Sequence, residues 1–290
     1  MLVDDPGDAP APGSLPVVVC YVGDELGGTG PEWADLVIGD DDVEATIANV
    51  ANAPLAATTL AIVLRTTPHL SVEEGLAVES AAYSMLQAGP EFARWRAENQ
   101  ARPEPSTAPT VITARIDDRL SITLDRPERH NAISARLRDD LTAALTLAVV
   151  DDSIRTIELT GNGPSFSSGG DLHEFGQRPD PVTGHLTRLA RSPARLVHRL
   201  RDRTSARVHG ATLGGGLETV AFAATVTADP DTRFGLPEVG LGLIPGAGGT
   251  VSLPRRIGRR RTAALALTNR TVDAATALRW NLIDAIDARR

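Results

Sequence analysis

The sequence predicts an α/β fold with a helical segment in front of it, and three observations support this prediction. The run VITARIDDRLSITLD from Val111 is rich in β-branched residues and alternates as two short strands do. Helical and strand-like runs alternate after it, which is typical of helices packed on sheets. The Pro-rich stretch 101–110 separates this body from an earlier segment of helical periodicity. We therefore expect a disordered tail at 1–14, an N-terminal helical extension at 15–100, a linker at 101–110 and an α/β domain at 111–290.

The extension has one expected strand and four expected helices. The apolar run from Leu15 to Val22 is the expected strand. The first three helices have start signals at Asp40, Pro54 and Ser71. Gly89-Pro90 breaks the third before a short amphipathic piece that ends near Asn99. Ser71 and Glu74 form a capping box, which satisfies two backbone N–H groups at the helix start. No catalytic constellation is evident in this segment.

In the body, an Asp-Asp turn at 117–118 joins the first two strands. The elements after it are expected as a helix at 134–150, a strand at 154–159, a helix at 186–201 and a strand at 206–208. The last strand leads into a glycine-rich stretch, 209–250.

Composition excludes several classes of protein. All 29 basic residues are arginine, because the chain has no lysine. A Walker-type phosphate loop needs a Gly-Lys pair and Schiff-base chemistry needs a lysine amine, so both are excluded. The six histidines show no ligand spacing, so no metal site is expected. The net charge of −8 has its acidic excess in the extension, and the small basic excess of the body does not indicate nucleic-acid binding.

The sequence also gives expectations about compartment and membrane. The single cysteine, Cys20, cannot form an intrachain disulfide, which is consistent with a reducing compartment. The N-terminus lacks the basic and apolar regions of a signal peptide. No apolar run approaches the roughly 18 residues of a membrane span. We expect a cytoplasmic protein without membrane association.

The stretch 209–250 has the residue types that acid/base chemistry needs. Three glycines, Gly214 to Gly216, precede Glu218 at an expected helix start, where free backbone N–H groups can stabilise an oxyanion. A second carboxylate, Glu238, follows in a Phe-Gly-Leu-Pro-Glu turn. Two carboxylates on separate elements near such a site suggest a general acid/base pair.

Four motifs of the body stand in a recognisable order. They are RPERHNA at 126–132, SFSSGGDL at 165–172, HGATLGGGLE at 209–218 and FGLPEVGLGLIPGAGGT at 234–250. Residues 111–287 thereby resemble the crotonase superfamily, the enoyl-CoA hydratase/isomerase family. The last two motifs together are highly specific at this spacing. The resemblance implies a crotonase-like ββα superhelix core that binds an acyl-CoA thioester.

The resemblance also implies where the substrate sits. By position, the thioester oxygen lies between the N–H groups of Gly170 and Gly215, which form an oxyanion hole. Coenzyme A enters as part of the substrate, so no separate cofactor is implied. The further substrate contacts expected are Ser168, Gly169, Asp171, Leu172, Gly214, Pro237 and Gly246. Asp171 has an alternative role, which is to cap a following helix.

Glu218 and Glu238 fall on the two positions that hydratases of the family use for catalysis. The resemblance implies hydration of a 2-enoyl-CoA to a 3-hydroxyacyl-CoA, with Glu218 acting mainly on the water and Glu238 supplying the C2 proton. We expect the two to titrate as a coupled pair. Isomerisation or other thioester-enolate chemistry stays open, because the fold hosts many reactions. A different class also stays open, a catalytically weak CoA-binding or assembly subunit.

The chain departs from the family at its end. Family members usually continue, after the position matched here by Leu282, into helices that close the acyl pocket and build the trimer. This chain stops at Arg290 and has a helical segment of similar size in front. We hypothesise that helices within 40–98 cover the pocket or the oligomer surface. The resemblance implies a homotrimer or a dimer of trimers.

Two further features have expected structural roles. The arginine run within 255–261 is expected as a solvated helix face, with contact to CoA phosphates as the alternative. His209 stands where the family usually has Asn, and we expect it to be structural.

Overall fold

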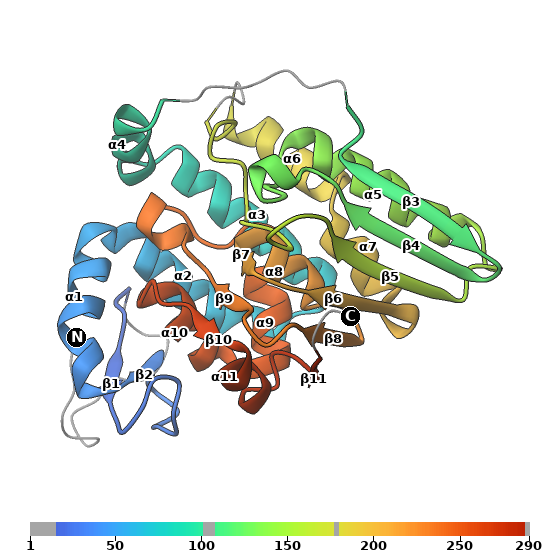
Figure 1. Cartoon of the computed structure of the whole chain (residues 1–290). Helices are drawn as coiled ribbons and strands as arrows, with labels where there is room; N and C mark the ends of the chain where they lie inside the picture. The colour runs from blue at the N-terminus through green and yellow to red at the C-terminus, as the bar shows by residue number, and fades with distance from the viewer. Residues whose placement is uncertain (1–15, 101–107, 177–179, 288–290) are drawn as a thin grey trace.

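The structure is a computed structural model that describes residues 16–100, 108–176 and 180–287. The tail predicted at 1–14 and most of the predicted linker lie outside the described residues. The body contains a six-stranded sheet in the order β11-β8-β6-β5-β4-β3 (Figure 1). Its strands are β3 (Val111–Ile116), β4 (Arg119–Leu124), β5 (Thr156–Gly161), β6 (Thr204–Val208), β8 (Thr225–Ala228) and β11 (Ala285–Ile286). The predicted mixed α/β class is confirmed.

The six-stranded sheet begins with the predicted hairpin. β3 and β4 pair antiparallel around a turn in which Asp117 has φ of 53°, and the other neighbouring strands pair parallel. Along β4, every second side chain is buried, namely Leu120, Ile122 and Leu124. This period of two places the buried face of the strand against α5 (Ala135–Val150). The helix was predicted from residue 134, which is its N-cap. Ser134 accepts a hydrogen bond from the N–H of Leu137.

A second sheet has three strands in the order β10-β9-β7. They are β7 (Ala211–Leu213), β9 (Arg233–Gly235) and β10 (Val272–Asp273). β7 leads directly into α8 (Gly214–Val220), whose residues are all buried. α8 packs against α9 (Gly249–Ile257) in the middle of the molecule. The triple glycine of the glycine-rich stretch therefore lies in the core.

One predicted helix of the body is wrong. The helix expected at 186–201 is two helices, α6 (Pro181–Ala190) and α7 (Pro193–Arg199). Pro193 has no N–H to continue a helix, and Ser192 caps the new start by accepting from the N–H of Arg195. The last helices of the body are α10 (Arg259–Leu267) and α11 (Ala274–Arg279), and β11 follows them.

The extension forms the predicted helices and a small sheet. The helices are α1 (Val43–Asn52), α2 (Pro54–Thr66), α3 (Val72–Gln87) and α4 (Pro90–Glu98). Both halves of the capping box at Ser71 and Glu74 are present. The expected strand is shorter than predicted, β1 (Cys20–Val22), because it pairs only with the unpredicted strand β2 (Leu36–Ile38), in parallel. No single helix among the described residues is long and apolar enough to cross a membrane. One pair of helical segments, Asp40–Asn52 and Pro54–His69, reaches that length and apolar character only when taken together, and the pair is bent by 104°.

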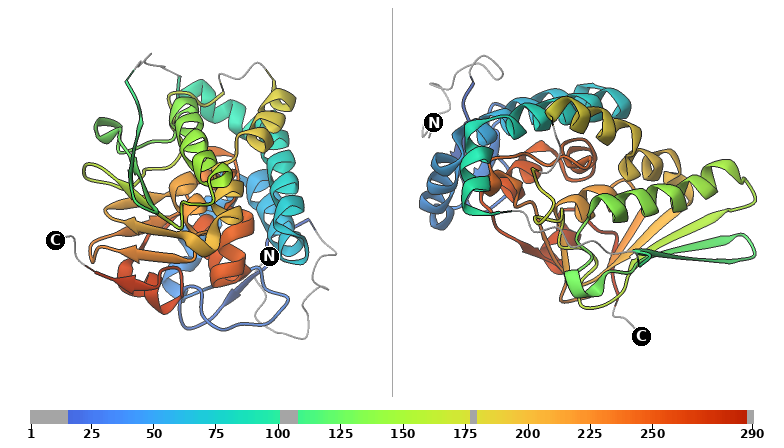
Figure 2. Two further views of the ribbon diagram at one scale, coloured as in Figure 1. Left: turned by 90° about the vertical axis from the view of Figure 1, so that its right-hand side faces the viewer. Right: turned by 90° about the horizontal axis from the view of Figure 1, so that it is seen from above.

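The extension shares its hydrophobic core with the body. In Figure 2 its blue and teal helices lie along one side of the orange and red helices, and the contacts agree: α3 packs on α6 and α9, and α2 packs on α9 and α10. Leu60 and Leu76 of the extension join one buried cluster with Leu217 and Val251 of the body. Burial of continuous apolar surface is the dominant stabilising term in such contacts.

The arginine run, expected as a solvated helix face, instead connects the two regions. Arg255 donates to the carbonyls of Thr67 and Leu70, and Arg259 donates to the carbonyls of Ala34 and Glu32. Arg255 is exposed, as predicted for a solvated face, whereas the prediction is wrong for Arg259, which is 24% exposed because the extension covers that part of the helix.

Candidate active site

One cavity brings together the main predicted site residues. It has a volume of about 200 Å³ and is lined by Gly170, Asp171, Gly215, Glu218, Glu238 and Gly246, among others. These residues come from a loop after β5, from α8, from the 3-10 turn Glu238–Leu241 and from the loop before α9. The structure therefore brings these predicted site residues together in one cavity, and their catalytic and substrate-binding roles stay predictions.

Glu218 is held by the backbone of the loop before α9. Its side chain is 1% exposed, and its Oε2 accepts hydrogen bonds from the N–H of Ala247 at 2.7 Å and of Gly249 at 2.8 Å. A Cβ at Gly249 would come within 2.6 Å of Glu218 Cγ, so only glycine permits this approach. Burial, followed by the charges of Glu238 and Glu79, raises the pKa of Glu218 well above its ordinary value, against the effect of the two N–H donors.

Glu238 has a different environment. It is 8% exposed, and its Oε2 has no hydrogen-bond partner among the described residues. Gly214, which has φ of 44°, lies beside it, and a Cβ there would stand 2.3 Å from Glu238 Oε1. Burial raises the pKa of Glu238 to about 7. A buried carboxyl oxygen without a protein partner is available to a ligand in the cavity.

The two predicted oxyanion-hole glycines both face the cavity. Gly215 is in the first turn of α8, where backbone N–H groups lack partners within the helix. Gly170 forms a parallel bridge with Ile133, in which Ile133 donates to Gly169 and accepts from Asp171. The N–H of Gly170 consequently points away from Ile133. Two glycines from separate elements thus contribute backbone to the same cavity wall.

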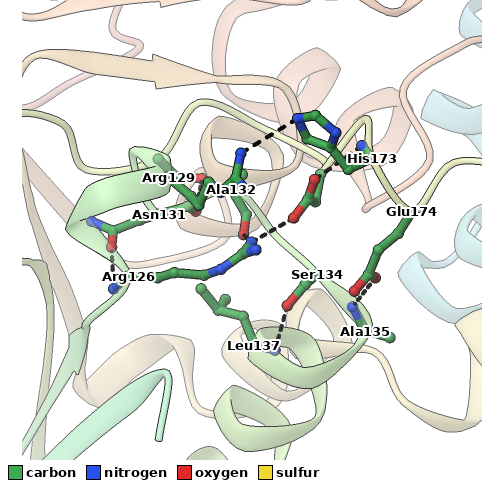
Figure 3. A network of polar contacts seen from close by, with 11 residues as sticks. Arg126, Arg129, Asn131, Ala132, Ser134, Ala135, Leu137, His173 and Glu174 are labelled. Carbon is green, nitrogen blue, oxygen red and sulfur yellow. Dashed lines mark hydrogen bonds and ion pairs between the residues drawn. The ribbon is translucent and has the colours of Figure 1, made fainter. Parts of the chain in front are cut away.

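Asp171 holds the Gly170 loop in place. It is buried, its Oδ2 pairs with Arg126 Nη1 at 2.5 Å, and its Oδ1 accepts from the N–H of His173 (Figure 3). Glu174 of the same loop accepts from the N–H of Ala135 at the start of α5. The segment after Asp171 is a turn among the described residues, so the alternative in which Asp171 caps a helix is wrong. These contacts connect the RPERHNA and SFSSGGDL motifs and position Gly170.

Five predicted substrate contacts do not line this cavity. They are Ser168, Gly169, Leu172, Gly214 and Pro237. Gly169 and Gly214 pack closely against each other next to residues of the cavity wall, since a Cβ on Gly169 would lie 3.6 Å from Gly214 Cα. Leu172 points outward and is 46% exposed.

The extension contributes residues that the sequence did not identify. Tyr83 and Gln87 of α3 line the cavity, and a Cβ at Gly246 would come within 2.3 Å of the Tyr83 ring. Arg188 of α6 also lines it and lies 4.5 Å above the centre of that ring. Glu79 and Tyr83 are polar residues four positions apart on the buried face of α3. This spacing was the sequence signal that could have indicated a contribution of α3 to the site. The sequence showed no catalytic constellation in the extension, and the structure places α3 in the cavity wall, in agreement with the hypothesis that helices within 40–98 cover the pocket.

A second cavity of about 110 Å³ adjoins the first. The two share Ile133, Arg138, Arg188, Gly246 and Ala247 in their walls. Its lining is mostly apolar and includes Leu76 and Leu141. Together the cavities provide a polar region at the glutamates and an apolar region beside them, as small-molecule sites commonly do.

The remaining predictions concern histidines and metals. His209 is buried, with Nε2 3.0 Å from the carbonyl oxygen of Gly163, in agreement with a structural role. Within the described ranges, no group of three or more His, Cys, Asp or Glu side chains has a geometry suited to a metal ion. The predicted lack of a metal and of a separate cofactor stays a prediction.

Comparison with known proteins identifies relatives of the body. The family model described as enoyl-CoA hydratase/isomerase matches residues 119–290, more than half of the chain. A probable enoyl-CoA hydratase of Rhizobium meliloti is 36% identical over 167 residues, which are 58% of this chain and 64% of that protein. A probable enoyl-CoA hydratase of Mycobacterium bovis is 34% identical over 183 residues, which are 62% of this chain and 69% of that protein. The match to the first relative thus spans less than two thirds of its length.

Solved structures give the same result. The crystal structure of an enoyl-CoA hydratase from Thermoplasma volcanium superposes with a TM-score of 0.57 at 32% sequence identity, covering 63% of this chain and 73% of that one. The predicted crotonase-like fold of the body is confirmed. The extension contributes most of the described chain that the family match leaves out.

Proposed function

Since the chain belongs to the enoyl-CoA hydratase/isomerase family, we propose that it hydrates a 2-enoyl-CoA thioester to a 3-hydroxyacyl-CoA. The observation that carries this proposal is the pairing of two buried carboxylates, Glu218 and Glu238, from separate elements in one cavity with the amides of Gly170 and Gly215. Addition of water needs a base for the water, an acid for C2 and donors for the thioester oxygen. The cavity has candidates for all three roles.

The proton is assigned by the hydrogen bonds of the two glutamates. Both pKa values are raised, so the pair retains a proton near neutral pH. The N–H groups of Ala247 and Gly249 stabilise an anion on Glu218, whereas Glu238 Oε2 has no such donor among the described residues. On these hydrogen bonds we place the negative charge on Glu218 and the proton on Glu238 in the reactive state, against burial and the charge of Glu238, which raise the pKa of Glu218 further.

The reaction follows from that assignment. Glu218 takes a proton from water as the water oxygen bonds to C3, and the double-bond electrons move toward the thioester oxygen. The amides of Gly170 and Gly215 stabilise the resulting enolate oxygen, a contribution that is typically about 3 kcal/mol for one donor. Glu238 then gives its proton to C2. Coenzyme A takes part only as the carrier of the acyl group.

Loss of the conjugated absorbance of crotonyl-CoA and of longer 2-enoyl-CoAs tests the proposal. We expect turnover by the wild-type protein, and a fall in kcat of about 100-fold or more in Glu218→Gln and in Glu238→Gln. Glu91→Gln is a matched control, because Glu91 is an equally buried glutamate that accepts from the N–H groups of Leu55 and Ala56, outside the cavity wall.

Other outcomes would support other functions. Gain of conjugated absorbance from a 3-enoyl-CoA, without hydration, would support an isomerase. Binding of CoA thioesters without turnover of any of them would support a CoA-binding subunit. The predicted homotrimer or dimer of trimers is tested by light scattering of the purified protein, and the cytoplasmic location stays a prediction.

A further inference from the structure

A third buried glutamate contacts the same loop as Glu218. Glu79 of α3 is 2% exposed, and its Oε1 accepts from the N–H of Gly248 at 2.7 Å. Its Oε2 accepts from the N–H of Thr250 at 2.8 Å and from the Thr250 hydroxyl at 2.7 Å. A carboxylate with three donors is a well-satisfied buried acceptor, so these contacts fix the loop to α3.

The hydrogen bonds of Glu79 and Glu218 alternate along one stretch of backbone. The N–H groups of Ala247 and Gly249 point to Glu218, and those of Gly248 and Thr250 point to Glu79. Each N–H lies in a planar peptide unit that is joined to the next unit at one Cα, so reorienting the N–H groups bound to one glutamate also changes the direction of those bound to the other. The orientation of Glu218 thus depends on a backbone segment whose other side is held by Glu79.

The charges around Glu79 come from several elements. Arg188 of α6, Glu218 of α8 and Glu238 of the 3-10 turn act on this region, with Tyr83 on the same helix as Glu79. Burial raises the pKa of Glu79 to about 7, opposed by its donors and by Arg188. Both glutamates lie at the N-terminus of α9, where the helix dipole favours negative charge. Arg188 is fixed in turn by Ser80, Ser84 and Gln87 of α3.

We propose that Glu79 is a positioning residue: it holds the segment 247–250 so that the amides of Ala247 and Gly249 orient Glu218 for catalysis. The catalytic part of this inference rests on the proposed hydratase function. The N-terminal extension then has a direct part in the chemistry of the body, beyond covering its cavity.

The test compares Glu79→Gln with Glu91→Gln in the full chain. Each variant removes a charge from a buried glutamate that accepts backbone hydrogen bonds in the extension, but only Glu79 contacts the 247–250 segment. The readout is amide hydrogen exchange of Ala247 and Gly249, which donate to Glu218 and not to Glu79. We expect exchange at these two amides to be about 10-fold faster in Glu79→Gln and unchanged in Glu91→Gln. The reason is that loss of the Glu79 contacts favours local opening of the 247–250 segment, whereas Glu91 has no contact with that segment.

Steady-state kinetics give a second readout. In Glu79→Gln we expect kcat to fall about 10-fold or more and by a larger factor than KM rises, because Glu218 is misoriented while Glu79 is only one residue in the wall of the second cavity. Glu79→Asp keeps the acceptor charge and should recover part of kcat. Equal acceleration of exchange in both Gln variants, or wild-type exchange in Glu79→Gln, would overturn the proposal.

Failure of the proposed function is distinguishable from failure of this inference. If the wild-type protein hydrates no 2-enoyl-CoA, the hydratase proposal fails, while amide exchange still decides whether Glu79 positions the segment. If Glu79→Gln does not fold, exchange in Glu79→Asp decides in its place: unchanged exchange at Ala247 and Gly249 contradicts the positioning role, and faster exchange at these amides alone supports it.

Discussion

The body and the N-terminal extension each place a buried glutamate on the same loop, but only one of the two is marked by a motif. Glu218 follows three glycines in a stretch that identifies the family, whereas Glu79 lies in an ordinary amphipathic helix. The difference is physical. Glu218 needs close backbone approach, which demands glycines and leaves a local pattern, while Glu79 meets its donors through the packing of two helices distant in sequence. The sequence motif therefore identifies Glu218, whereas Glu79 becomes evident only from the packing of α3 against α9.

Glycine substitutions test this contrast, and the largest effect is expected at Gly214. Gly214→Ala puts a Cβ 2.3 Å from Glu238 Oε1 at a residue with φ of 44°, so Glu238 must move. We expect kcat to fall about 100-fold, since displacement of a reacting group by about 1 Å has effects of that size. The measurement is hydration of a 2-enoyl-CoA.

Gly75→Ala in the extension is the matched change. Its Cβ would lie 3.0 Å from Val251 Cγ2, where a side chain can shift by a few tenths of an ångström. Higher helix propensity of alanine offsets that contact, so activity should stay within about 3-fold of wild type. An equal loss of activity in both variants would remove the distinction between the two regions.

The pH dependence of stability gives the next effect. The pKa of Glu238 is raised from 4.5 to about 7 in the folded protein. The contribution of this carboxyl to the stability of the folded state is therefore complete below the unfolded pKa of 4.5, and it is lost as the pH rises through about 7. Gln at this position does not titrate. The free energy of unfolding of the wild type should therefore decline relative to Glu238→Gln between about pH 4.5 and 7, by about 3 kcal/mol at most.

Urea unfolding at a series of pH values measures this difference. Glu79 has the same direction of shift, to about 7, so Glu79→Gln should show the same trend. A constant difference between wild type and Glu238→Gln across this range would mean that the carboxyl is not desolvated as the structure has it.

Particular residues show how far sequence reasoning reaches. The capping box at Ser71 predicts a helix start correctly because capping is a local interaction. The break at Pro193 was missed although proline marks it, because the apolar spacing continues on both sides. The glutamates and glycines of the cavity were found through their motifs. Tyr83, Gln87 and Arg188 were not, because their place in the wall is set by the contact of α3 with α6, which no local pattern specifies.

The smallest expected effect concerns an ion pair between the two regions. Arg195 Nη1 of α7 lies 3.8 Å from Glu73 Oε2 of α3, and both side chains are largely exposed, at 47% and 65%. Solvent screens such a pair, so Arg195→Gln should change the free energy of unfolding by no more than about 0.5 kcal/mol. Leu76→Ala, at a buried position of the same helix, should cost about 3 kcal/mol through the cavity it leaves. If denaturant unfolding gave the larger loss for Arg195→Gln, surface charge rather than shared apolar packing would hold the extension on the body.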